Sequence, residues 1–366
     1  MSFSTLPLAA ESFSDYGLAG EYGTLADGIP EAVRPYLPDG AGGTEDISEV
    51  GETVQKMTAW DYILDVSGHI LSVEWGAAAR LFGTMAGMVL LCAGVESVVR
   101  TFCAERMHRV FGMGLSLLLF TRLLTFFYEQ MERVRGLLDG LAATTTAFLP
   151  MLTALHALGG ATTTAAVQNG GLLTFLSLVG TVCNRTILPV SAVCLSLTLT
   201  GTLSQGNSLG GLTRTVKNGY TGTLAFLLLV LGFVMSSQTA LAAATDSLGA
   251  RAAKFVSARL IPVTGGAVGD SLRTLSAGVV YLKNTVGVGA VAVMFLLVLP
   301  VIVSLFLNRL TLGLCAALAE LLGCERERKM LSDFQQLYGM LLAVISLCVL
   351  LFVFSMILFV RSSVAW

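Results

Sequence analysis

Long apolar stretches with few or no charged side chains dominate this sequence from about residue 77 to its end. A helix of about 20 apolar residues crosses the hydrocarbon core of a bilayer, so uncharged length locates candidate crossings. Six crossings are predicted, over residues 77–99, 110–127, 171–204, 219–244, 284–308 and 335–360. The fold class indicated is all-α, a polytopic helical membrane protein with its transmembrane domain over residues 77–366.

The region before the first crossing has a different pattern. It carries ten acidic and only two basic residues in its first 60 positions. Over residues 53–75 the apolar positions fall on one helical face and end at Trp75, which predicts an amphipathic helix lying on the membrane. We therefore expect residues 1–76 to form an acidic extracytoplasmic region. Residues 1–12 lack the basic start of a signal peptide, so we expect the natural start to differ.

Lys and Arg gather in three short segments between the crossings, residues 100–109, 210–218 and 325–329. Basic residues favour the cytoplasmic side of a membrane, so all three are predicted to lie inside, which places the N-terminal region outside. Residues 140–184 carry no charge over 45 positions, too many for one simple span. Eight crossings therefore stay open as an alternative, if residues 140–170 form a full hairpin.

Two further segments, residues 128–139 and 309–322, place apolar side chains on one side and charged ones on the other, which predicts surface helices. Charged residues near the ends of crossings are expected to reach the nearby membrane surface. Arg185 instead stands between long uncharged runs, and it is the candidate for facing an aqueous path.

Prolines and paired glycines interrupt two of the apolar stretches. Backbone that stops being helical at membrane depth must be buried in protein or line a cavity. We therefore predict two re-entrant segments, about residues 144–168 and 255–280, with Gln168 as polar lining. The candidate pathway or gate residues are Pro150, Gly159, Gly160, Asn169, Arg185, Pro262, Gly265, Gly266, Asp270 and Asn284. The alternative, that the small residues only let helices approach closely, stays open.

Other chemistry finds no support in the residue patterns. The net charge of −2 provides no basic stripe for nucleic acid. The seven cysteines are scattered without a C-x-x-C, and the three histidines stand alone, so neither a disulfide framework nor a zinc site is expected. Motifs for nucleotide binding or hydrolysis are also missing from the sequence. We predict a protein that is not an enzyme and needs no cofactor.

Several motifs resemble one known family. Ala-Lys-Phe-Val at residues 253–256, Ile-Pro-Val at 261–263 and Leu-Lys-Asn-Thr-Val-Gly at 282–287, together with Phe-Leu-Pro at 148–150 ahead of the glycine pair at 159–160, are similar to the stage III sporulation protein AE family of endospore-forming bacteria. The resemblance covers about residues 75 to 360.

The resemblance implies a multi-pass protein of the outer forespore membrane, which derives from the mother cell. Its implied partners are the lipid bilayer, other membrane proteins of the same operon and a forespore protein, in a channel or secretion-like complex between the two cells. An oligomer is compatible with this role. Two alternatives stay open: a stand-alone secondary transporter for a small solute, and a structural anchor for partner subunits.

Overall fold

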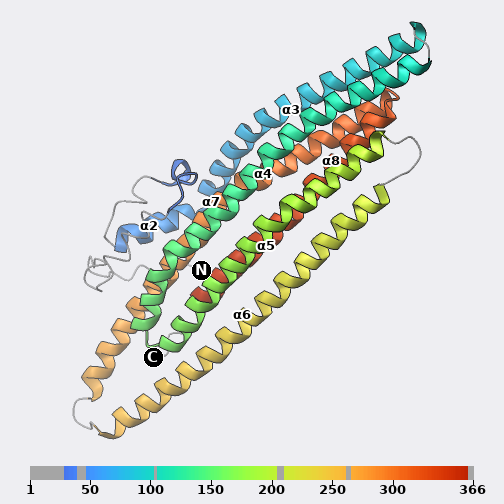
Figure 1. Cartoon of the computed structure of the whole chain (residues 1–366). Coiled ribbons are helices and arrows are strands. Elements are labelled where there is room, and N and C mark those ends of the chain that lie inside the picture. The colour runs from blue at the N-terminus through green and yellow to red at the C-terminus, as the bar shows by residue number, and fades with distance from the viewer. Residues whose placement is uncertain (1–28, 39–46, 103–104, 204–209, 261–264, 362–366) are drawn as a thin grey trace.

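The computed structural model describes residues 29–38, 47–102, 105–203, 210–260 and 265–361 (Figure 1). A short 3-10 helix, η1 (Arg34–Tyr36), and helix α2 (Ile47–Met57) precede six long helices. These are α3 (Trp60–Phe102), α4 (Glu105–Leu158), α5 (Thr162–Leu203), α6 (Gly210–Leu260), α7 (Gly265–Leu321) and α8 (Glu325–Arg361). Within the described ranges there is no strand, and the all-α prediction is confirmed.

The six long helices alternate in direction and lie side by side in one elongated bundle (Figure 1). At one end, called the basic end, α3, α5 and α7 end and α4, α6 and α8 begin. At the other, called the turn end, α4 and α6 end and α5 and α7 begin. The three helix starts that carry the basic segments therefore share one end, as the predicted orientation requires.

Six segments of the described chain are long and apolar enough to cross a membrane. They are Trp60–Val99, Val110–Leu158, Thr162–Gly201, Gly211–Gly249, Ala277–Leu321 and Glu325–Val360. Each contains all or nearly all of one predicted crossing, so the polytopic helical class is confirmed.

The helices are much longer than the predicted crossings. Helix α4 has 54 residues and α7 has 57, which at about 1.5 Å per residue makes each roughly 80 Å long, against about 30 Å of hydrocarbon. The predicted surface helix at 128–139 is the middle of α4, and the boundary predicted after residue 76 falls inside α3. Helical hydrogen bonds continue through a change of polarity, so polarity alone does not locate helix ends.

The segment predicted as re-entrant over residues 144–168 takes a different form. It completes α4, turns over three residues and begins α5. Gly160 has a φ of 74°, and the Ala161 amide donates to the His156 carbonyl at 2.9 Å. These are features of the Schellman motif, in which glycine ends a helix. The glycine pair therefore joins two long antiparallel helices, and the re-entrant character of this hairpin stays a prediction.

Pro150 was expected to interrupt the same segment, yet it lies inside α4. Proline removes one backbone hydrogen bond, and membrane helices tolerate that loss when neighbouring groups compensate. The second segment predicted as re-entrant, residues 255–280, consists of the end of α6 and the start of α7, with residues 261–264 outside the described chain.

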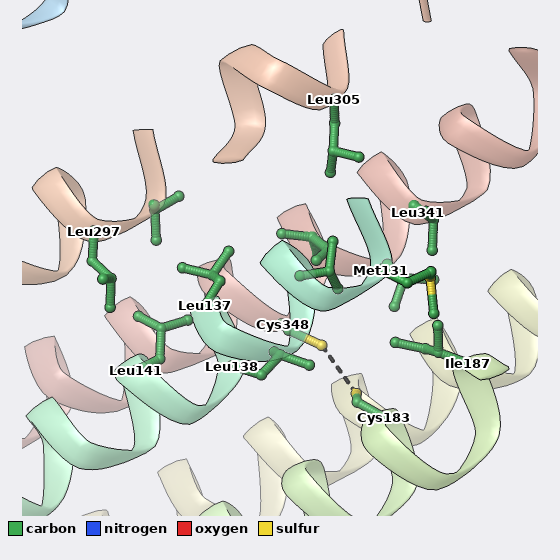
Figure 2. Packing of buried hydrophobic residues seen from close by; sticks show 14 of the residues in the cluster. Met131, Leu137, Leu138, Leu141, Cys183, Ile187, Leu297, Leu305, Leu341 and Cys348 are labelled. Carbon is green, nitrogen blue, oxygen red and sulfur yellow. Dashed lines mark hydrogen bonds between the residues drawn. The ribbon is translucent and has the colours of Figure 1, made fainter. Parts of the chain in front are cut away.

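Buried apolar side chains form a continuous core along the bundle. Figure 2 shows part of it, with side chains from α4, α5, α7 and α8 that include Met131, Leu138, Ile187, Leu297 and Leu341. The Sγ atoms of Cys183 and Cys348 lie 3.2 Å apart between α5 and α8 (Figure 2). Lipid is as apolar as these side chains, so close packing is what holds such helices together in a membrane.

Candidate functional site

The predicted site residues do not meet at one point. Pro150, Arg185 and Asn284 are exposed on α4, α5 and α7, and Asn169 is half-buried on α5. Arg185 follows Thr162, the first residue of α5, by 23 positions (185 − 162), roughly 35 Å along the helix. Arg185 therefore lies far from the turn that holds Gly159 and Gly160.

The remaining predicted site residues lie at the start of α7 or before it. Gly265, Gly266 and Asp270 belong to the first turns of α7, where the structure describes the helix but not the side chains. Pro262 lies outside the described residues. The role of these residues therefore stays a prediction.

A carboxylate holds the first turn of α5 at the turn end of the bundle. The buried Asp246 of α6 accepts hydrogen bonds from the backbone amides of Thr163 at 3.1 Å and Thr164 at 2.7 Å. Negative charge is stabilising at a helix N-terminus, where amides lack helical partners. One side chain thereby fastens α6 to the α4–α5 hairpin.

More buried polar groups surround this contact. His156 of α4 is fully buried, its Nδ1 lies 2.7 Å from the Leu152 carbonyl, and its ring packs edge-on against Phe359 of α8. Lys283 of α7 is also buried, and the charges of Lys283 and Asp246 both act on the His156 ring. We call Asp246, His156 and Lys283 the turn-end cluster. The sequence did not predict it, because each member is a single ionisable residue on a different helix.

Two amides beside this cluster have buried oxygens. Gln168 Oε1 and Asn169 Oδ1 have no hydrogen-bond partner among the described residues, while Gln168 Nε2 donates to the Leu358 carbonyl at 3.5 Å. Orphan acceptors of this kind are places where water or a bound group completes the bonding. The prediction that polar groups line this part of the bundle therefore has a structural counterpart close to the α4–α5 turn.

A row of charges lies farther along α4, on its outer side. This α4 strip consists of Glu129, Glu132, Arg133, Arg135 and Asp139, all exposed except the half-buried Arg135. Arg133 Nη1 lies 3.3 Å from Glu74 of α3 and 3.3 Å from Ser304 Oγ of α7. Arg135 pairs with Glu132 at 3.7 Å. The strip is thus joined to α3 and α7 through Arg133, while the side chains of Glu129, Glu132 and Asp139 remain exposed.

The depth of the α4 strip follows from its neighbours. Gln130 Nε2 lies 3.3 Å from Ser304 Oγ, and a Cβ on Gly140 would lie 2.9 Å from Leu297. Both α7 residues belong to the uncharged stretch 284–308. The ring of Phe127 lies 5.8 Å from that of Tyr338, which lies near the start of the uncharged part of α8 after Asp333. The strip therefore lies beside the parts of α7 and α8 that contain no ionic residue.

The apolar stretches of α5, α6, α7 and α8 coincide along the bundle. Cys183 touches Cys348, Gly232 approaches Leu351, and Gly287 approaches Val360. These contacts place the apolar stretches of all four helices at one level, with the exposed Arg185 of α5 at that level too.

The apolar stretch of α4 lies at another level. Ser116 Oγ donates to Glu327 Oε1 at 2.9 Å, and Phe120 packs against Phe334. The middle of this stretch, near residue 118, therefore lies beside about residue 329 of α8, whereas the apolar stretch of α8 is centred near residue 348. The difference of about 20 residues corresponds to roughly 30 Å. A bilayer that covers α5–α8 thus leaves the α4 strip at membrane depth.

These features define a polytopic helical membrane protein with a charged strip on α4 beside the uncharged parts of α7 and α8. A family model described as stage III sporulation protein AE matches residues 47–363, and the chain belongs to that family. The chain is similar to the stage III sporulation protein AE of Bacillus subtilis (strain 168), with 26% identity over 218 residues, or 60% of this chain. It spans 55% of that relative. No solved structure matches the chain.

Proposed function

We propose that this protein is an integral membrane component of the channel or secretion-like complex between mother cell and forespore, and that it contributes a transport pathway or gate. Its place would be the outer forespore membrane, with other membrane proteins of the same operon and a forespore protein as partners. Family membership supports the role in sporulation. The α4 strip is the observation that supports a pathway.

The carboxylates of the α4 strip would be costly to bury in lipid. A charged side chain at the bilayer centre costs about 2.5–3.5 kcal/mol on insertion scales, so such residues face water or protein. Glu129 and Glu132 are exposed at the level of the uncharged part of α8. A single chain surrounded by lipid would leave both carboxylates against hydrocarbon. A water-filled path, closed by further copies or partner subunits, removes that cost.

The opposite side of the bundle has the character of a lipid-facing surface. Helix α6 lies at the far edge from α3 (Figure 1), and its outward side chains are large and apolar. The exposed ones include Leu212, Phe226, Leu229, Phe233, Leu241 and Leu248. An assembly with α3 and α4 toward a central path and α6 toward lipid places both faces in suitable surroundings. This arrangement is part of the proposal.

The experiment that tests the proposal measures ion selectivity of the assembled complex in planar bilayers. Glu129→Lys together with Glu132→Lys reverses two carboxylates of the α4 strip, and we expect the preference for cations over anions to fall several-fold. Glu320→Lys is the matched control, because Glu320 is an exposed glutamate near the basic end of α7. Unchanged selectivity in the double variant, with conduction intact, would exclude the strip from the pathway.

The same preparations distinguish the two alternative functions. Solute flux through liposomes that contain this chain without partners is expected only of a stand-alone transporter. Loss of complex assembly in the strip variant, without any conductance in the wild-type complex, would favour a structural anchor.

A further inference from the structure

Three metal-ligating side chains come together at the basic end of the bundle. They are Glu96 of α3, Cys324 of the α7–α8 turn and Glu327 of α8, and their ligand atoms all lie within 4.8 Å of one another. Cys324 and Glu327 are buried, and Glu96 is half-buried. Cys324 Sγ lies 3.9 Å from Glu96 Oε2. Residues more than 220 positions apart in sequence thus converge on one small volume.

Backbone geometry fixes two of these side chains. Gly323 has a φ of 76°, and the Cys324 amide donates to the Ala319 carbonyl at 2.9 Å, which ends α7 in a Schellman motif. The Cys324 carbonyl then accepts the Arg328 amide at 3.0 Å as α8 begins. Cys324 and Glu327 are therefore held three residues apart, on a tight turn and the first turn of a helix.

The cluster also has a second thiol and an orienting hydroxyl. Cys92 is buried one helical turn before Glu96, on the same face of α3, and the charges of Glu96, Cys324 and Glu327 all act on it. Ser116 of α4 donates to Glu327 Oε1 at 2.9 Å, which leaves the other carboxylate oxygen for a further partner. One thiol and two carboxylates, from α3, the α7–α8 turn and α8, can therefore reach one point, with Cys92 nearby.

We propose that Glu96, Cys324 and Glu327 bind a divalent transition metal ion, with Zn²⁺ as the best fit and a water molecule as its fourth ligand. Zn²⁺ accepts thiolate and carboxylate ligands in tetrahedral sites with bonds of about 2.0–2.3 Å, which places ligands roughly 3.3–3.8 Å apart. Small side-chain movements from the present separations reach that geometry.

The site would fasten α3 to the α7–α8 turn. It lies at the level where the apolar stretch of α4 meets the charged start of α8, so it would hold the α3–α4 hairpin in its displaced position. The basic segments place this end inside, where thiols stay reduced and able to bind metal.

Sequence analysis did not expect a metal site. The ligands are Glu96 in α3 and a C-x-x-E in the turn, and they are separated by more than 220 residues. Only the packing of α3 against the α7–α8 hairpin brings them together. This site is independent of the proposed function, because it requires no conducting pathway.

The test uses the full chain purified in detergent, stripped of metal with a chelator and titrated with Zn²⁺ and then with Co²⁺. We expect one ion per chain by elemental analysis, and a thiolate-to-cobalt charge-transfer band in the near-ultraviolet. Cys324→Ser should lose the band and weaken Zn²⁺ binding by more than the roughly 10–100-fold that loss of an outer-shell partner costs. Cys194→Ser is the matched control, because Cys194 is a buried thiol of α5 outside the cluster.

Glu96→Gln is a second variant, in case Cys324→Ser does not fold. The half-buried Glu96 tolerates substitution more readily than Cys324 in the turn. It should keep the native elution volume and the thiolate band while Zn²⁺ affinity falls. No bound ion in the reconstituted wild type would overturn the proposal. Equal Zn²⁺ affinity in wild type, Cys324→Ser and Glu96→Gln would overturn it as well.

Discussion

Helices α4 and α8 run side by side in the same bundle, yet they distribute charge in opposite ways. The part of α8 beside the α4 strip contains no ionic residue, because α8 is packed against α4, α5, α6 and α7. The outer side of α4 has no such cover and carries five charges within residues 129–139. The difference shows that the polarity of a helix depends on the cover that its neighbours provide and not only on its level along the bundle. A helix at the edge of a bundle can be charged at a level where its central neighbour is wholly apolar.

The largest loss of stability is expected when a charge is placed on the uncharged part of α8. Cys348 is fully buried, so Cys348→Asp would bury a carboxylate without a cation, at a cost of about 3–5 kcal/mol. We expect most of the protein to aggregate on size exclusion in detergent and the remainder to melt far below the wild type. Cys348→Ala is the control. A Cys348→Asp protein that melts normally would mean that the centre of the bundle contains water.

A smaller loss of stability is expected from removing Asp246 of α6, a buried charge that already has hydrogen-bond partners. Asp246→Ala removes the carboxylate that accepts two amides of α5, and loss of an N-terminal cap costs about 0.5–2 kcal/mol. Asp246→Asn keeps an acceptor and should recover part of that stability. Thr245→Ala, an exposed neighbour, should change the free energy of unfolding by less than about 0.5 kcal/mol. Equal melting of the two Asp246 variants would show that the cap is not responsible.

The smallest effect on stability is expected from the ion pair between Arg133 of the α4 strip and Glu74 of α3. A double-mutant cycle of Arg133→Ala and Glu74→Ala measures their coupling, which is about 0.2–1 kcal/mol for ion pairs in contact with water. The Arg133 side chain is 49% exposed, so we expect a value in that range, and a lower one at high salt. A coupling of several kcal/mol that is insensitive to salt would indicate that the strip is shielded from water.

Uncharged length located the helices, because lipid-facing and central segments of α5 to α8 contain few or no ionic residues. It could not locate the ends of α4, since residues 128–139 continue the same helix with charge on an open face. The glycine pair at 159–160 was found as an interruption, but its conformation depends on φ and on hydrogen bonds across the turn. The sequence therefore predicted the position of this turn but not its conformation.

The candidate site was harder to predict for a related reason. Asp246, His156 and Lys283 are single ionisable residues on three helices, and only the packing of these helices brings them together. Gln168 and Asn169 have buried side-chain oxygens, and their predicted role as polar lining of a pathway stays a prediction. The register between α4 and α8, which gives the α4 strip its depth, depends on contacts between distant segments.

Water access to the α4 strip in native membranes tests the central claim most directly. On a background without native cysteines, Glu132→Cys on α4 and Phe226→Cys on α6 are compared with a membrane-impermeant thiol reagent in membranes from sporulating cells. Both positions are exposed in the single chain, and the aligned contacts place both beside the uncharged part of α8. We expect rapid labelling of Glu132→Cys and none of Phe226→Cys. Equal labelling of the two, or labelling of Phe226→Cys alone, would contradict an aqueous pathway along α4.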